Sequence, residues 1–530
     1  MNQAHLVDIF YSSFAEQALA LVSARSPVVK RTLDRFGPVG LANYLRQSLS
    51  ICEPPLQPRN DLLEIVYRYT APLLGETIAE KAAQELQALP AVLTANHHGV
   101  DFLAQSVQSS LLFSLREVGG KPATTVPVFA CGNVPLNNPT FPRGLLLYHA
   151  DRGVAKFTLP IKLPVFLDRH KRQLVSVVEA YDAAMLLRAE QRLATMARTK
   201  QIPFNLAAAA EKILGEDYRN SLASGLKSYS QQAVILNNLI WKRCFREPEQ
   251  APEMVFLELE KIASQLLQVD LHDENSLIWQ VMFNPTLRDE VLSRLDGAKA
   301  CWDRNRLTKR MRQGPSDKKS DPGSCGTTFF WAVDNTGRRV PLMLTSSTDH
   351  QVMLQGRDDR SELWAFSFNP KDINRNLQVG KLLPSLFTCY SIIGFARGIS
   401  CCGGYFQADY LSNIQSALVG AFSEIMGETR FVEYVNRVPT SIYLSGMQGV
   451  MHSLDSDFLL PAGPIEIIAS GGLSPNQIEQ MRSLTVRDAH LGGLTETLPD
   501  FFPHYNLPDN WQLLVAEECN HFLKNRTLAI

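Results

Sequence analysis

The chain lacks the long hydrophobic runs that mark membrane proteins. No apolar stretch reaches the about 20 residues that a membrane-spanning helix needs, and the best candidate, 382–395, is interrupted by Pro384. The first residues carry His5 and Asp8 and no basic cluster, so they do not resemble a secretory signal peptide. We therefore expect a soluble, cytoplasmic protein with no membrane partner.

Cysteine pairs and an excess of charge are also missing. The nine cysteines are scattered over 530 residues, and no two are spaced as Cys-x-x-Cys. This pattern argues against a disulfide framework, a zinc ribbon and an iron–sulfur site, and it favours a reducing compartment. Because 52 basic residues are balanced by 53 acidic ones, the chain shows no sign of a nucleic-acid partner.

Several well-known catalytic motifs are absent. The sequence has no dinucleotide-binding fingerprint, P-loop, kinase motif set, His-Glu-x-x-His or clean nucleophile elbow. We therefore predict no nucleotide cofactor.

What is present indicates a mixed α/β (α+β) fold. Apolar residues make up 45% of the chain, which is ordinary for a globular protein that can bury a large core. The spacing of apolar residues changes along the chain and suggests five segments. These are an N-terminal helical cap (1–88), an α/β region that bears the site (89–180), a large helical segment (181–303), a linker (304–326) and a C-terminal α+β domain (327–530).

Strand signals concentrate in two of these segments. The apolar run 91–95 is followed by a short polar loop and then by helical spacing that ends at Gly119, which is half of a βαβ unit in a partly parallel sheet. Further strand candidates in this region are 126–130, 159–167, which its two prolines make an edge strand, and 174–178. Short connections predict an antiparallel meander from the runs 329–333, 340–344, 352–354 and 363–368.

The sharpest chemical feature is the cluster of His97, His98 and Asp101. It follows the first predicted strand, and ligands of open α/β sheets bind at the carboxyl ends of strands. Imidazole and carboxylate groups can hold a divalent metal such as zinc, manganese or iron, and a neutral imidazole can also act as a general base. Adjacent residues on an extended segment point to opposite sides, so we expect only one histidine to face the site unless the loop kinks at Gly99. A structural alternative is that Asp101 caps the following helix and that the histidines are buried donors.

Amide side chains gather after the second predicted strand. Asn96 of the first loop, and Asn133, Asn137 and Asn138 of the second, offer paired donors and acceptors to a substrate, and Arg143 could bind its anionic group. The alternative is turn chemistry, since asparagine, glycine and proline are common turn residues. Cys131 could be a nucleophile, although most single cysteines are small buried hydrophobic residues.

Two glycine-rich segments could be either binding sites or purely structural turns. Arg397 and Gln407 flank the turn expected at 401–404 and could bind substrate. The turn at 471–474 precedes a helix start with a capping box and could bind an anion.

The sequence shows no resemblance to a known family, and three hypotheses about its function are compatible with it. The first is an enzyme that acts on a small polar or anionic metabolite, as a metal-dependent hydrolase or lyase that uses His97, His98 and Asp101. The second is a metal-free transferase with a histidine general base. The third is a non-catalytic binding or assembly protein, and a homo-oligomer is compatible with all three.

Overall fold

The computed structural model describes most of the chain. The described residues are 14–49, 51, 55–149, 160–314, 325–346, 351–427, 429–454, 458–502, 511 and 527–530. The first 13 residues of the expected helical cap and residues 315–324 of the expected linker lie outside them.

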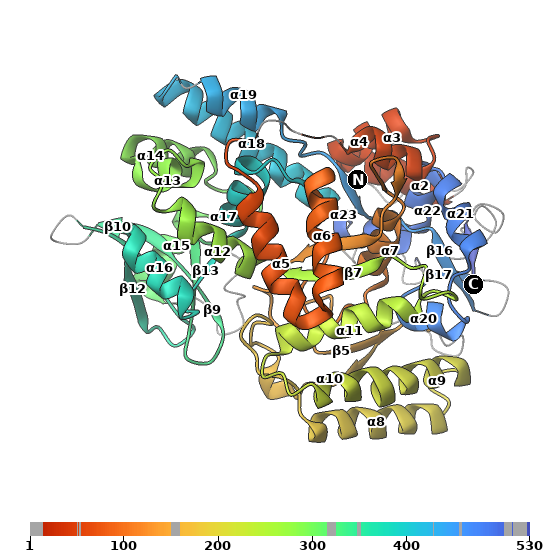
Figure 1. Ribbon diagram of the computed structural model, residues 1–530. Helices are drawn as coiled ribbons and strands as arrows, with labels where there is room; N and C mark the ends of the chain where they lie inside the picture. The colour runs from red at the N-terminus through yellow and green to blue at the C-terminus, as the bar shows by residue number, and fades with distance from the viewer. Residues whose placement is uncertain are drawn as a thin grey trace, which may run out of the picture.

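A parallel five-stranded sheet forms the centre of the molecule (Figure 1). Its strand order is β15-β14-β1-β4-β7, and every neighbouring pair runs parallel. The strands span Ala91–Leu93 (β1), Thr125–Ala130 (β4), Glu253–Glu258 (β7), Ser400–Gly404 (β14) and Tyr443–Ser445 (β15). The mixed α/β class expected from the sequence is therefore confirmed.

The chain reverses its direction of progress across this sheet after β7. It moves from β1 to β4 and β7 on one side, and β14 and β15 are then added on the other side. In such sheets the loops at the reversal point leave a crevice at the carboxyl ends of the strands.

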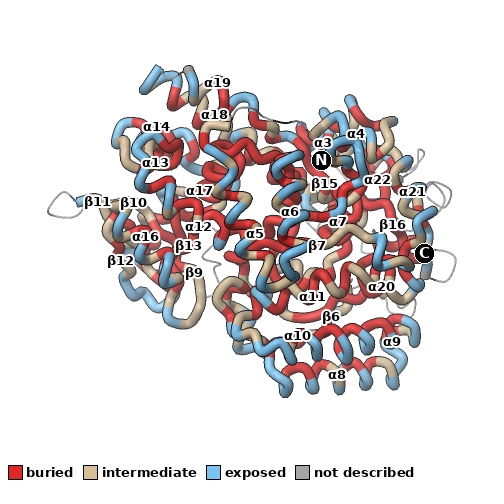
Figure 2. Tube along the Cα trace, viewed as in Figure 1, coloured by how far each residue is buried: buried red, intermediate tan, exposed pale blue. Residues whose placement is uncertain are grey.

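Alternate residues of the strands pack into two separate cores. Val92 and Val255 belong to one hydrophobic cluster, and Leu93 and Met254 belong to another on the opposite face. One face is covered by α5 (Asn60–Leu74), α6 (Glu76–Ala88) and α12 (Leu259–Asp270), and the other by α2 (Phe14–Arg25), α3 (Pro27–Phe36), α4 (Leu41–Ser48), α7 (Ala104–Ser114) and α11 (Tyr229–Arg243). Figure 2 shows the buried strands between these helices. Burial on both faces explains why β1, β4 and β7 read as mostly apolar runs and not as alternating ones.

Two strands occur where the sequence predicted something else. The region 181–303 was expected to be mostly helical, with no strand assigned to it, yet β7 pairs with β4 over its whole length. The pair Cys401-Cys402 was expected in a turn, but both residues are buried in β14, where Cys401 lies opposite Val92 of the central strand. The second difference arises because pairing with the distant strand β1 overrides local composition.

The remaining strand predictions had mixed outcomes. The expected edge strand forms β6 (Ile161–Pro164), which pairs with β5 (Gly144–Leu147). The expected strand 174–178 is wrong, since only Leu174 makes an isolated bridge, to Pro135. The helix after Asp101 ends at Ser114, and the short strands β2 (Glu117–Val118) and β3 (Lys121–Pro122) form a hairpin around the two glycines.

A second lobe lies beside the sheet and contains the expected meander (Figure 1). Its antiparallel sheets have the orders β10-β11-β12 and β13-β8-β9. The strands are β8 (Phe330–Val333), β9 (Arg339–Pro341), β10 (Met343–Ser346), β11 (Val352–Arg357), β12 (Leu363–Ser367) and β13 (Leu382–Pro384). The first part of the expected linker is helix α15 (Arg304–Gln313), which begins where the Asp303 side chain accepts a hydrogen bond from the N–H of Arg306.

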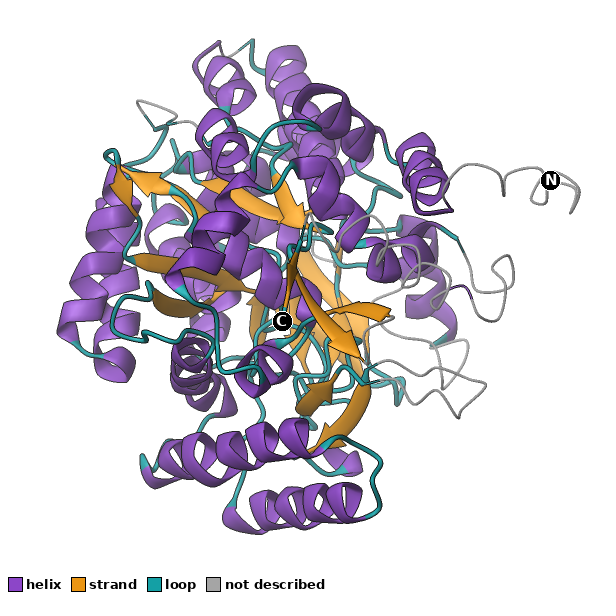
Figure 3. Ribbon diagram, turned by 90° about the vertical axis from the view of Figure 1, so that its right-hand side faces the viewer, coloured by secondary structure: helices purple, strands orange, loops and turns teal. Residues whose placement is uncertain are grey.

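Helices make up most of the rest of the described chain, and a hairpin of α8 (Ala183–Arg198) and α9 (Phe204–Lys212) extends from one side (Figure 3). The other helices are α10 (Arg219–Ala223), α13 (Leu277–Phe283), α14 (Pro285–Arg294), α16 (Pro370–Gln378), α17 (Leu386–Tyr390), α18 (Tyr405–Ile425), α19 (Thr429–Arg437), α20 (Pro464–Ala469), α21 (Pro475–Ser483), α22 (Val486–Gly492) and α23 (Leu494–Phe501). Short π-helical turns span Ile213–Tyr218 and Ser391–Ala396, a 3₁₀ turn spans Asp168–His170, and a small sheet joins β16 (Val450–Leu454), β17 (Phe458–Pro461) and β18 (Leu528–Ala529). Within the described part of the chain, no helix is long and apolar enough to cross a bilayer.

Candidate active site

A cavity of about 490 Å³ opens at the carboxyl ends of the central strands. We call it the edge cavity. The sheet side contributes His97, Cys131, Asn133, Asn138 and Glu260. The segment before α15 contributes Lys299, α15 contributes Arg306, and the second lobe contributes Trp331 and Arg339. The cavity therefore lies where a parallel α/β sheet usually binds its ligand, and it combines an imidazole, amides and cations.

The His97 ring has a defined tautomer. Its Nδ1 lies 3.0 Å from Oδ1 of Asn138, and the same oxygen accepts hydrogen bonds from the N–H and the hydroxyl of Thr140. Because an amide oxygen only accepts, Nδ1 carries the proton and Nε2 has the lone pair. Burial lowers the pKa of His97, the hydrogen bond to Asn138 opposes this shift, and the charge of Arg339 adds to it. The imidazole is therefore neutral at pH 7 and can accept a proton at Nε2.

Glu260 holds the loop that follows β4. Its carboxylate accepts hydrogen bonds from the N–H groups of Gly132 (2.7 Å) and Asn133 (3.1 Å) and from the thiol of Cys131 (3.0 Å). Burial raises the pKa of Glu260, and these three donors oppose the shift. The pKa of Cys131 lies well above its ordinary value, because the thiol is buried and next to the Glu260 charge. Cys131 is thus a neutral donor at pH 7 and does not have the thiolate that a cysteine nucleophile needs.

Asn133 presents an unused acceptor at the edge cavity. Its side chain lines the cavity and is 5% exposed, and its Oδ1 has no hydrogen-bond partner within the described residues. A buried amide oxygen without a partner is costly, so such an atom is suited to a ligand donor. Arg339 donates a hydrogen bond to the backbone oxygen of Asn133 and lies 4.8 Å from the ring centre of Trp331. These contacts hold one cation of the second lobe against the loop of the sheet.

His98 faces the opposite way from His97, as expected for neighbours on extended backbone. Its Nε2 lies 2.9 Å from Oγ of Ser230, and burial lowers the pKa of the ring to about 4. The kink at Gly99 occurs at a φ of 115°, and it does not bring the two rings to one side. Only His97 lines the edge cavity.

Asp101 forms hydrogen bonds with residues close to it in the sequence. Its carboxylate accepts hydrogen bonds from the hydroxyl of Ser106, the amide of Asn96 and the N–H of Leu103, just before α7. Burial raises its pKa to about 6. His97, His98 and Asp101 thus have separate partners and do not fit one shared metal ion. Within the described residues, no group of three or more histidine, cysteine, aspartate or glutamate side chains is arranged to hold a metal.

The other residues singled out from the sequence lie outside the edge cavity. Asn137 is exposed, and Arg143 pairs with the exposed Asp168 at 2.7 Å. Arg397 is fully buried in contact with two carboxylates, and Gln407 donates a hydrogen bond to the hydroxyl of Thr94 (2.5 Å). Arg143, Arg397 and Gln407 thus have local partners, and none of the four side chains is among the residues that line this cavity.

Several lining residues were missed by the sequence analysis. Glu260 follows β7, which was not predicted, although the run Met254–Leu257 after Pro252 is a strand signal. Arg339 and Trp331 were read only as parts of the meander, and nothing in their local pattern indicates that they lie across from β4. Comparison with known proteins adds no identification: no family model, no curated protein and no solved structure matches the chain.

Proposed function

We propose that the protein is an enzyme that binds a small anionic metabolite in the edge cavity and uses His97 as a metal-free general base. The observation that carries this proposal is the hydrogen bond from Nδ1 of His97 to Asn138, which leaves Nε2 as a proton acceptor on a neutral ring. A positioned imidazole of this kind accelerates proton transfer by about 10² to 10⁴-fold. Removal of a proton from the hydroxyl of an acceptor substrate would suit a transferase.

The charges of the opposite wall support an anionic substrate. Lys299, Arg306 and Arg339 line the cavity together with one carboxylate of the same wall, Asp303, which pairs with Arg306 at 3.2 Å. Lys299 lies 3.9 Å from Asp409, and Glu260 accepts three hydrogen bonds from its own loop. A planar guanidinium such as that of Arg339 can form two parallel hydrogen bonds with a carboxylate or a phosphate. The Oδ1 atom of Asn133 would then accept a hydrogen bond from a hydroxyl or amide of the same ligand.

The first experiment separates binding from chemistry. A panel of small carboxylates and phosphate esters is screened by thermal shift and by fluorescence of Trp331, and each bound compound is then incubated with the protein and followed by NMR. We expect Arg339→Met to weaken binding by about 10 to 100-fold, because a hydrogen bond to a charged group is worth about 1.5 to 3 kcal/mol. We expect His97→Asn, whose amide can still donate to Asn138, to bind normally and to lose at least about 100-fold in turnover.

The controls distinguish the alternatives. His272→Asn changes an exposed histidine and should leave both measurements unchanged. Turnover that is lost with EDTA and restored by zinc, manganese or iron would contradict the metal-free mechanism and support the hydrolase or lyase hypothesis. Compounds that bind without any turnover in the NMR experiment would contradict an enzyme and support a binding protein.

A further inference from the structure

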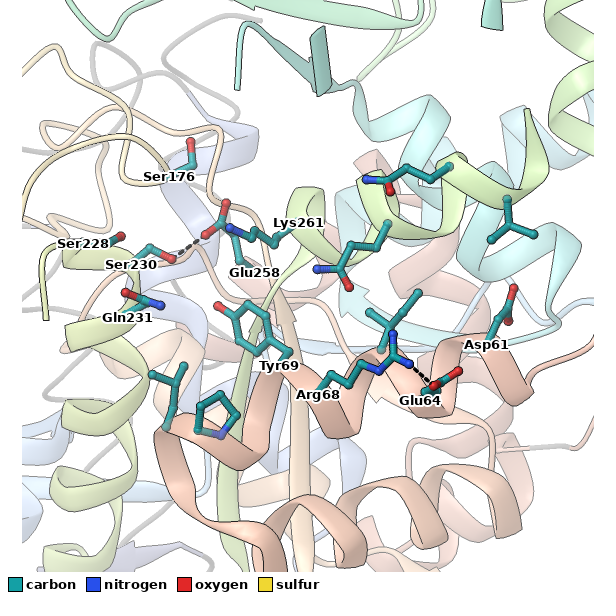
Figure 4. A pocket seen from close by; sticks show the side chains of 16 residues that line it. Asp61, Glu64, Arg68, Tyr69, Ser176, Ser228, Ser230, Gln231, Glu258 and Lys261 are labelled. Carbon is teal, nitrogen blue, oxygen red and sulfur yellow. Dashed lines mark hydrogen bonds and ion pairs between the residues drawn. The ribbon is translucent and has the colours of Figure 1, made fainter. Parts of the chain in front are cut away.

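A second cavity lies near the carboxyl end of β7, and its floor contains a serine and a glutamate in contact (Figure 4). Its volume is about 680 Å³, and it is bordered by α5, α11 and α12. We call it the Ser230 groove. Ser230 and Glu258 are 3% and 5% exposed, and both line it. The edge cavity does not include either residue.

The hydroxyl of Ser230 is held between a donor and an acceptor. Its Oγ donates a short hydrogen bond to Oε2 of Glu258, drawn as a dashed line in Figure 4. Nε2 of His98 lies 2.9 Å from this Oγ and 3.2 Å from the backbone oxygen of Ser230. Because a carbonyl oxygen only accepts, Nε2 carries the proton and His98 is the donor. The Ser230 proton is therefore directed at the carboxylate.

Glu258 is suited to accept that proton. Burial raises its pKa to about 7, while the hydrogen bond from Ser230 and the charge of Lys261 oppose the shift. A base with a pKa near the working pH combines the correct charge state with sufficient basicity. The packing also fixes the group, since a Cβ atom added at Gly132 would lie 3.0 Å from Cγ of Glu258.

The start of α11 supplies a place for negative charge. The helix begins at Tyr229, so the N–H groups of Ser230 and Gln231 are in its first turn and have no acceptor within the helix. Such groups stabilise an anion at a helix N-terminus. In addition, the hydroxyl of Ser176, which also lines the groove, is buried and has no hydrogen-bond partner among the described residues. One nucleophilic oxygen in contact with a proton acceptor therefore shares the groove with these donors, and a nucleophile beside its base is a recurring catalytic arrangement.

We propose that the Ser230 groove is a second active site, in which Ser230 is the nucleophile and Glu258 the general base for hydrolysis of an ester of a small polar acid. Polar side chains dominate the groove, including those of Gln231, Gln265 and Gln268, which favours a short polar acyl group over a lipid chain. The proposal does not depend on the function of the edge cavity.

The reaction balances with water as the only second reactant. The Ser230 oxygen attacks the ester carbon, its proton passes to Glu258, and the carbonyl oxygen becomes an oxyanion near the first turn of α11. When the ester bond breaks, Glu258 gives that proton to the departing alkoxide and leaves an acyl group on Ser230. Glu258 then takes a proton from water, the resulting hydroxide attacks the acyl carbon, and the proton returns to the Ser230 oxygen.

The test is covalent labelling of the intact full-length protein. A small fluorophosphonate probe is added at pH 7.5, and peptide mass spectrometry locates the adduct. We expect one adduct on Ser230 and none in Ser230→Ala, while Ser228→Ala, which changes another serine lining the groove, labels at the normal rate. We expect Glu258→Gln to label at least about 100-fold more slowly, because an amide cannot take the proton. His97→Asn should label normally, which separates this proposal from that for the edge cavity.

A second measurement uses the unmodified protein and so does not depend on whether a variant folds. Incubation with 4-nitrophenyl acetate should give a burst of nitrophenol and an acetyl group on Ser230. The proposal would be overturned if folded wild-type protein gave no adduct on Ser230 with millimolar fluorophosphonate and no burst of nitrophenol with 4-nitrophenyl acetate. Equal labelling of wild type and Glu258→Gln would overturn the role of the carboxylate.

Discussion

Loss of the Arg397 guanidinium should destabilise the protein strongly without affecting ligand binding. Arg397 is fully buried, and its guanidinium contacts both oxygens of Asp270 at 2.9 and 3.0 Å, as well as Asp61. Asp270 is only 1% exposed, so in Arg397→Met its charge would be buried without a counterion. Removal of one partner of a buried ion pair costs about 3 to 5 kcal/mol, a large part of the about 5 to 15 kcal/mol that stabilises a typical domain.

The assay is unfolding in urea at pH 7, followed by far-UV circular dichroism. We expect Arg397→Met to lower the free energy of unfolding by about 3 to 5 kcal/mol. The double variant Arg397→Met/Asp270→Asn should recover about 1 kcal/mol or more, because it no longer buries an unpaired charge. Affinity for any ligand of the edge cavity should be unchanged. A loss below about 1 kcal/mol, or a selective loss of ligand affinity, would refute this reasoning and return Arg397 to the substrate-binding role considered from the sequence.

Three further predictions follow from the site and its surroundings. Gly99→Ala should cost about 1 to 3 kcal/mol in urea unfolding, since the φ of Gly99 is 115° and a Cβ there would lie 2.5 Å from that of Pro142; an unchanged midpoint would contradict this. Burial raises the pKa of Glu466 from 4.5 to about 7, so between these pH values the unfolded chain binds fewer protons than the folded one. The free energy of unfolding should therefore fall by up to about 3 kcal/mol as pH rises through this range. In thermal melts from pH 4 to 8, Glu466→Gln should show a smaller dependence on pH. Cys131 should resist iodoacetamide at pH 8 in the folded protein and react in urea, because burial and the Glu260 charge keep its thiol protonated. If mass spectrometry shows rapid alkylation of Cys131 in the folded protein, its thiol is not buried beside Glu260 as described.

Local sequence patterns were sufficient for the elements whose structure is decided locally. The apolar run before Asn96 forms β1, and the polar loop after it reaches the carboxyl edge of the sheet, where His97 lines a cavity. The alternation rule for extended backbone also separated His97 from His98. The chemical use of each histidine depends on Asn138 and Ser230, which the spacing of the histidines does not indicate.

What the sequence did not indicate depends on pairing over long distances. Cys401 and Cys402 have glycines and serine as neighbours, a composition typical of turns, and they form a strand because β1 offers an open parallel edge. Glu258 is the last residue of β7 and Glu260 follows it, in a region expected to be mostly helical, so neither was considered for a site. Arg397 next to a glycine resembled an anion-binding residue, whereas its partners Asp61 and Asp270 are distant in the sequence and adjacent only in the fold.

The position of β1 at the centre of the sheet has a consequence for synthesis on the ribosome. Val92 pairs with Cys401, so one edge of the central strand cannot be completed until about 300 more residues have been made. At about 5 to 20 residues per second this takes roughly 15 to 60 s. During that time a short apolar strand has an unpaired edge, which is a template for aggregation. Growing chains stalled before β14 should therefore depend on chaperones far more than the completed protein does.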